Sequence, residues 1–144
     1  MCILFCVVYY LKATFGPGTG EAVLEIPVSV SDSGMCLSFM YRISSPRIEL
    51  VVLKSKTGKT EASYMQRLKY TDQKDIGKWN GEELELDFDT EAIHLVAKKT
   101  GCTTNVAYVL VDDIEIDHCM YGNGPPFNFS SLSVLVCGLF RDLN

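Results

Sequence analysis

Apolar and polar residues alternate one by one along several short segments of this chain. Over residues 84–90, Leu84, Leu86 and Phe88 alternate with acidic residues. A period of two residues is typical of a β-strand that buries one face and exposes the other. Two more segments share this pattern, and their predicted buried positions are Leu37, Phe39, Tyr41 and Ile43 in one and Ala22, Leu24, Ile26 and Val28 in the other.

Turn-forming residues separate these segments from one another and from four further apolar runs. Gly16-Pro17-Gly18 and Asn80-Gly81 are two of these turn signals. No window of about a dozen residues keeps the apolar spacing of an amphipathic helix. The pattern therefore predicts an all-β sandwich or barrel rather than a parallel α/β sheet. The further runs lie at 48–53, 93–97, 106–116 and 132–136.

Size and charge exclude some classes of function. The chain has 144 residues, of which 47% are hydrophobic, so it fits one globular domain that can bury its own core. The formal net charge is -5, and no stripe of lysine and arginine reverses it locally. Nucleic acid is therefore not an expected partner.

Six cysteines are scattered along the chain, and no Cys/His cluster has the spacing of zinc ligands. Wide separation favours disulfides, and so an oxidising compartment. The alternative is that several cysteines are reduced and buried as small apolar residues. The six are Cys2, Cys6, Cys36, Cys102, Cys119 and Cys137.

The first eleven residues are almost all apolar. This run is shorter than the roughly 20 residues that a membrane-spanning helix needs. Two interpretations stay open, because the run resembles both the apolar part of a signal peptide and a buried β-strand.

The sequence offers no convincing catalytic residues. His118 is next to Cys119, but adjacent side chains on a strand point to opposite faces, so a nucleophile–base pair is not expected. His94 lies in a strand-like run, where an ordinary surface role is the simpler interpretation. We therefore expect no enzyme activity.

Asp112 is the one acidic residue that the pattern places on an apolar face. If the alternation of residues 108–116 is unbroken, Asp112 points inward and needs backbone donors, a basic partner or a metal. It either accepts hydrogen bonds from neighbouring backbone N–H groups or binds Ca²⁺ or another hard cation. The other residues on this face are Tyr108, Leu110, Ile114 and Ile116.

Several segments, in order, resemble the MAM domain, an extracellular module. The cysteine-bearing segment Met35–Arg42 is similar to the family's "Cys-Leu-x-Phe-x-Tyr" strand, and Asn105–Ile116 is similar to its "Ile-Ala-Leu-Asp-Asp-Ile" signature. Trp79 precedes a strand as in the family, and Cys119 stands where the family has a closing cysteine. Weaker matches lie at 22–27 and 93–97.

The resemblance implies a fold and a function. The family fold is a two-sheet antiparallel jelly-roll sandwich, in which Trp79 would anchor the core. Family members occur in receptor phosphatases, neuropilins, meprins and zonadhesin-like proteins, where they mediate adhesion or homophilic association without catalysis. The expected protein is a cell-surface or secreted one whose parent is membrane-associated, and no small-molecule substrate is expected.

The resemblance also implies a disulfide between Cys36 and Cys119. It closes a loop of 83 residues in sequence separation, and such a crosslink stabilises a chain by about 4 kcal/mol on the chain-entropy model. Cys102 then has no family partner and is either free or paired with Cys2, Cys6 or Cys137.

The ends of the chain depart from the family pattern. We divide the chain into an atypical segment 1–6 in place of the family's opening cysteine block, a MAM-like sandwich over 7–119 and an extension over 120–144. In some members the missing block helps to bind a cation together with the Asp-Asp-Ile strand, so its absence counts against a structural Ca²⁺ at Asp112.

Two alternative functions and one modification site complete the predictions. The alternatives are a carbohydrate-binding jelly roll and a shortened fragment without independent function. Asn128 begins the sequon Asn-Phe-Ser, a candidate glycosylation site. The aromatic residues that could stack on sugars are Tyr64, Tyr70, Trp79 and Tyr121.

Overall fold

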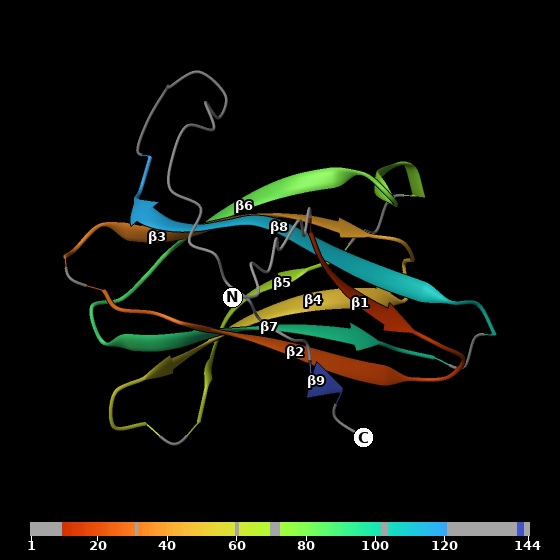
Figure 1. Ribbon diagram of the computed structural model, residues 1–144, viewed down its shortest axis with the longest axis horizontal. Coiled ribbons are helices and arrows are strands. Elements are labelled where there is room, and N and C mark those ends of the chain that lie inside the picture. Colours follow the sequence, from red (N-terminus) through yellow and green to blue (C-terminus); the bar gives the residue numbers. More distant parts are fainter. Residues whose placement is uncertain are drawn as a thin grey trace, which may run out of the picture.

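Two antiparallel β-sheets stack face to face in the computed structural model (Figure 1). The structure describes residues 10–30, 32–59, 61–69, 73–101, 104–120 and 141–142. Sheet A has the strand order β1 (Leu11–Phe15), β8 (Ala107–His118), β3 (Met35–Ile43) and β6 (Trp79–Glu85). Sheet B has the order β5 (Ser63–Leu68), β4 (Ile48–Lys56), β7 (Thr90–Lys99), β2 (Gly20–Pro27) and the short β9 (Arg141–Asp142).

The chain passes from one sheet to the other at nearly every connection. Of the described strands, only β4 and β5 follow each other within the same sheet. This jelly-roll-like path confirms the predicted two-sheet antiparallel sandwich. The only helix among the described residues is one 3₁₀ turn, Gln73–Asp75. No helix in this part of the chain is long and apolar enough to cross a membrane.

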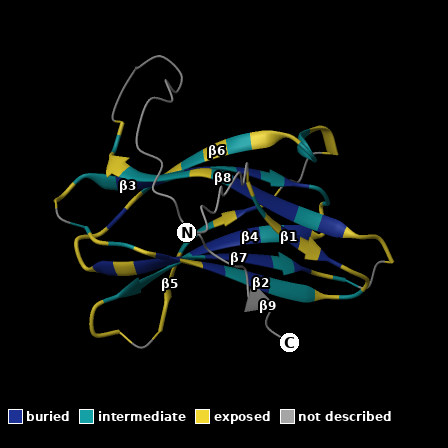
Figure 2. Ribbon diagram, viewed as in Figure 1, coloured by how far each residue is buried: buried dark blue, intermediate teal, exposed yellow. Residues whose placement is uncertain are grey.

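The core lies between the two sheets and consists of the alternating apolar residues of both (Figure 2). All four residues predicted to face inward over 37–43 are buried, as are Ala22, Leu24 and Ile26 of β2. Val28 is only partly buried but packs against the core. Burying one such leucine or phenylalanine stabilises the fold by about 1.5–3 kcal/mol.

The strand predicted over residues 84–90 ends earlier than the alternation suggests. Leu84 and Leu86 contact the core as predicted, but β6 stops at Glu85, and Phe88 is 71% exposed. Here the chain turns to cross from sheet A to sheet B, and the N–H of Thr90 donates to the carbonyl of Asp87. The prediction for Phe88 is wrong because this turn interrupts the alternation.

One extra residue in β8 changes which side chains face inward. Opposite the two-residue step from Ser38 to Met40 on β3, β8 advances three residues, from Glu115 to Asp112. This β-bulge lets residues before and after it both turn their apolar side chains to the core. Before it the inward residues are Ala107, Val109 and Val111; after it they are Ile114 and Ile116.

The prediction that Asp112 points inward is therefore wrong. Unbroken alternation would have placed it with Ile114, but the bulge places it with Tyr108 and Leu110 on the outer face. Its Oδ1 accepts a hydrogen bond of 2.8 Å from the N–H of Asp113, one of the two roles expected for this carboxylate. Asp113 itself has a φ of 49°, a left-handed conformation that aspartate tolerates better than branched residues do.

The bulge conformation makes a testable prediction about Asp113. Asp113→Val should destabilise the fold by about 1–2 kcal/mol, because a β-branched residue is strained at this φ. Asp113→Gly should match the wild type or exceed it in stability. Urea unfolding of the three proteins measures both effects, and equal stability of the valine variant would contradict the proposed strain.

A disulfide joins Cys36, in β3, to Cys119, just beyond β8, as the resemblance implies. The two Cα atoms are 4.9 Å apart, and the N–H of Cys119 donates to the carbonyl of Gly34. The bond thus ties together the ends of two neighbouring strands that are 83 residues apart in sequence.

Replacing both cysteines should lower the free energy of unfolding by up to about 4 kcal/mol, since the open chain gains conformational entropy when unfolded. Chemical denaturation of Cys36→Ser/Cys119→Ser against the oxidised wild type measures this difference. A double variant as stable as the wild type would show that the crosslink contributes nothing.

Candidate functional site

A hollow on the outer face of sheet A brings together aromatic and basic residues that face away from the core. Its central row crosses all four strands, because Lys12 pairs with Leu110, Leu110 with Arg42, and Arg42 with Trp79. We call it the aromatic hollow; its volume is about 600 Å³. It is lined by Tyr10, Lys12, Met40, Arg42, Trp79, Tyr108, Leu110, Asp112 and Asp113.

Trp79 lies in the aromatic hollow and not in the core. The family pattern predicted a core anchor, but Trp79 is 38% exposed and is absent from the buried cluster between the sheets. The reason is register: Trp79 pairs with Arg42, and the inward residues of β3 are its neighbours Tyr41 and Ile43. Tyr10, at the opposite edge of sheet A, is 44% exposed.

Two cations lie among these rings. The Nζ of Lys12 lies 5.1 Å from the centre of the Tyr108 ring, a distance at which the ring attracts a positive charge. The Nε of Arg42 is buried and has no hydrogen-bond partner. Within the described residues, neither Lys12 nor Arg42 forms an ion pair.

The acidic side of the aromatic hollow is formed by the bulge. Partial burial, together with the negative charge of Asp112, raises the pKa of the Asp113 carboxyl above its usual range. In the described ranges no three histidine, cysteine, aspartate or glutamate side chains gather as a metal site would need. Ca²⁺ binding at Asp112 stays a prediction. For such a site β8 supplies two neighbouring carboxylates, those of Asp112 and Asp113.

Beyond the bulge, the outer face of sheet A becomes acidic. Ser38 and Cys36 of β3 are small, and each pairs with an acidic residue on both neighbouring strands. The charge on this face is therefore divided along the strand direction, with the unpaired cations at one end. The four acidic residues are Glu83 and Glu85 on β6 and Glu115 and Asp117 on β8.

The sequence model described as "MAM domain, meprin/A5/mu" matches residues 8–120 of this chain. The chain belongs to the MAM domain family. Domains of this family are typically extracellular adhesion or interaction modules and are usually non-catalytic, although they also occur in proteases such as meprin. The Cys36–Cys119 disulfide of this MAM domain agrees with an extracellular setting.

Comparison with other proteins adds two distant similarities. "Family 16 Carbohydrate Binding Module-2" is 13% identical, with 76% of each chain covered and a TM-score of 0.45. The structure titled "Structure of Eiger TNF from S. frugiperda" is 9% identical, covering 82% of this chain and 99% of its own, with a TM-score of 0.30. Among curated proteins, no sequence matches this MAM domain.

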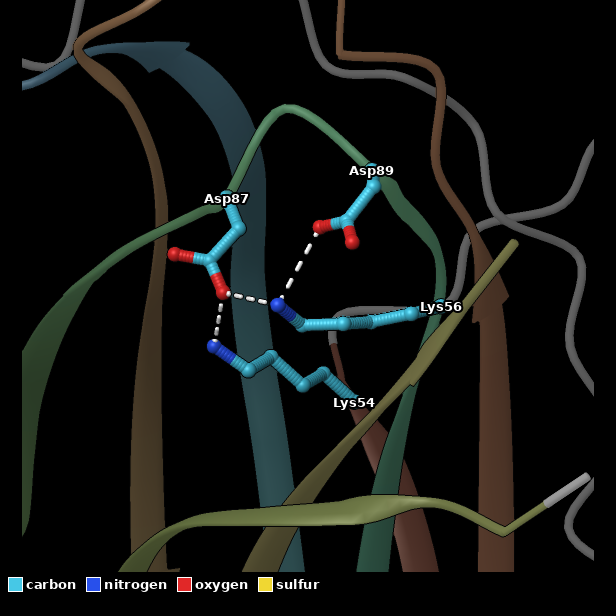
Figure 3. Close-up of polar contacts among 4 residues, drawn as sticks. All are labelled: Lys54, Lys56, Asp87 and Asp89. Atoms are coloured by element: carbon cyan, nitrogen blue, oxygen red, sulfur yellow. Dashed lines mark hydrogen bonds and ion pairs between the residues drawn. The ribbon is translucent and has the colours of Figure 1, made fainter. Parts of the chain in front are cut away.

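A second charged cluster lies at one end of sheet B, where the last residues of β4 meet the connection from β6 to β7 (Figure 3). Asp87 contacts the ammonium groups of Lys54 and Lys56, the latter at 2.8 Å, and Lys56 also reaches Asp89 at 3.2 Å. The N–H of Thr57 donates to the carbonyl of Asp89 in the same place. The two ammonium groups and two carboxylates balance each other, so the cluster fastens the crossover between the sheets.

Two hydrogen bonds, the stronger effect coming from Lys54 and the next from Lys56, lower the pKa of the Asp87 carboxyl to about 2. A carboxyl with a pKa of 3.8 when unpaired and about 2 in the fold stabilises the protein above about pH 4 and loses that effect as the pH falls towards 2.

Asp87→Asn should therefore lower the urea midpoint at pH 6, and its difference from the wild type should shrink between pH 4 and pH 2. Glu61→Gln, which removes the charge of an exposed carboxylate that forms no ion pair within the described residues, is the control and should leave the profile unaltered. A wild-type and an Asp87→Asn profile that stay parallel down to pH 2 would disprove the role of this carboxylate.

Of the remaining predicted site residues, those that the structure describes do not line the aromatic hollow. Cys119 is bonded to Cys36, so its sulfur is not a free thiolate that His118 could activate. Tyr64 is 59% exposed but lies on sheet B. Tyr70, Tyr121, Asn128, Cys2, Cys6, Cys102, Cys137 and the apolar run 132–136 lie outside the described residues, as do residues 1–9 of the N-terminal run.

Sequence reasoning missed Lys12, Met40, Arg42 and Tyr108 as site residues. A signal was present for two of them, because the alternation that buries Phe39 and Tyr41 turns Met40 and Arg42 outward. The alternation of residues does not reveal which strands lie beside β3. It therefore could not predict that Arg42 shares a row with Lys12 and Trp79.

Proposed function

We propose that this MAM domain is a non-catalytic, extracellular protein-interaction module that binds its partner through the aromatic hollow. The observation that carries the proposal is the set of residues that line the aromatic hollow, above all the neighbouring pair Arg42 and Trp79. Tryptophan, tyrosine, methionine and arginine are enriched at protein interfaces. Tryptophan, tyrosine and arginine contribute most of the binding energy of such interfaces. Family membership and the Cys36–Cys119 disulfide support the extracellular setting.

In this proposal the domain belongs to a secreted or cell-surface protein whose parent is membrane-associated. It serves adhesion or receptor association, and the partner is either a second copy or another surface protein. The partly exposed Trp79 and Tyr10 would supply apolar contact area at the two edges of sheet A, with Met40 and Leu110 between them.

A carbohydrate-binding module is the second candidate, and one observation favours it. Trp79 and Tyr10 present exposed ring surface at the edges of an open hollow, and sugar rings can stack on such exposed aromatic surfaces. The two candidates differ in what their partner is made of, which an experiment on cells can decide.

The test is binding of the oxidised, fluorescently labelled domain to cells that have been treated with a protease or with glycosidases. We expect protease treatment to abolish binding and glycosidases to leave most of it, because the partner is a protein. Binding that survives protease and is lost with glycosidases would replace the proposal with the carbohydrate candidate.

The surface itself is tested by Trp79→Ala, which should weaken binding at least tenfold while the domain stays folded, since Trp79 lies outside the core. Tyr64→Ala is the matched control, because Tyr64 is an exposed aromatic residue on the opposite sheet. Equal losses in both variants, or none in either, would remove the aromatic hollow from the proposal.

A further inference from the structure

We infer that the aromatic hollow takes an acidic side chain of an extended peptide segment, held between Lys12 and Arg42. The inference rests on the proposed function and names the chemistry of the partner. Its basis is a pair of cations that have no carboxylate among the described residues and share one row of sheet A.

Among the described residues, four basic residues of the domain pair with carboxylates, whereas Lys12 and Arg42 do not; they differ from the exposed Arg47 and Lys59, which also lack an ion pair there, in lying together in the aromatic hollow. Lys54 and Lys56 pair with Asp87, Lys98 with Glu21, and Arg67 with Glu49. Lys12 and Arg42 have no such partner in the part of the chain that the structure describes, although the domain as a whole carries an excess of negative charge. The outer face of sheet A therefore has two positive charges available to a ligand.

Their spacing suits one carboxylate. Lys12 is on β1 and Arg42 on β3, with Leu110 of β8 paired to both. Strands are about 4.8 Å apart, so the two backbones are about 10 Å apart, and two long side chains can close on one carboxylate from opposite sides. Leu110 is buried between them, and an apolar floor strengthens a charge-assisted hydrogen bond above it.

The neighbouring aromatic rings restrict the positions of the Lys12 and Arg42 side chains. The Tyr108 ring attracts the Lys12 ammonium, so this exposed side chain lies towards the ring on the outer face of the sheet. Arg42 is paired with Trp79, whose exposed ring would cover an apolar side chain next to the bound acid.

The carboxylates of the same face favour a peptide over an acidic polysaccharide. Asp112 pairs with Met40, which is two residues along β3 from Arg42, so the row of Asp112 lies about 7 Å from the row of Lys12 and Arg42. A polymer with repeated negative charges would run into Asp112 and, further along, into the acidic rows beyond the bulge. A peptide with one acidic residue followed by neutral or basic residues avoids this repulsion, so charge also fixes its direction.

The test is an array of random, end-blocked dodecapeptides probed with the oxidised domain, beside a panel of sulfated and sialylated oligosaccharides. We expect binding peptides to be enriched in one aspartate or glutamate and the oligosaccharides to stay at background. For the best peptide, exchanging that residue for its amide should weaken binding at least tenfold, and this measurement needs no change in the protein.

On the protein side, Lys12→Gln/Arg42→Gln should weaken the same peptide at least tenfold. Lys98→Gln, a charge removed from sheet B, should stay within twofold of the wild type. Peptide binders without acidic enrichment, equal binding by the double variant, or preferential binding of the anionic oligosaccharides would each overturn the inference.

The two proposals fail in different ways. If protease-sensitive cell binding is lost in Trp79→Ala but unchanged in Lys12→Gln/Arg42→Gln, the acidic-segment inference is wrong and the proposed function stands. If no protease-sensitive binding exists, the proposed function is wrong and this inference with it.

Discussion

The bulge in β8 is the constraint on which the rest of sheet A depends. β8 lies between β1 and β3, so the orientation of its side chains sets both the core and the outer face. An unbroken alternation would have buried either Val109 with Asp113 or Asp112 with Ile114. The extra residue avoids both, at the cost of a left-handed Asp113, and it leaves Asp112 on the outer face with Leu110, where both line the aromatic hollow.

Two further interactions hold this arrangement in place from its edges. The Cys36–Cys119 bond fixes the start of β3 to the end of β8, at the acidic end of the outer face of sheet A. The ion pairs of Asp87 fasten the crossover that follows β6, the strand that carries Trp79. Neither lies in the aromatic hollow, so the paired charges around Asp87 serve structure, while Lys12 and Arg42 are available for the recognition that we propose.

The alternation of apolar and polar residues correctly predicted features that depend on a single strand. Strict alternation was enough for the buried face of β3, since Phe39 and Tyr41 obey it, and the ordered motifs were enough for the family. Alternation failed at Phe88, where a turn ends the strand, and at Asp112, where register shifts by one residue. The failure at Asp112 and the outward position of Trp79 both depend on pairing between distant strands, whereas Phe88 lies in a local turn between the two sheets.

The central claim is that the outer face of sheet A, and not sheet B, meets the partner. Hydroxyl-radical footprinting of the domain bound to cells tests it directly, because Trp79 and Met40 on sheet A and Tyr64 on sheet B are reactive side chains in one protein. The account predicts that binding protects Trp79 and Met40 and leaves Tyr64 as reactive as in the free domain. Protection of Tyr64 with no change at Trp79 would contradict it.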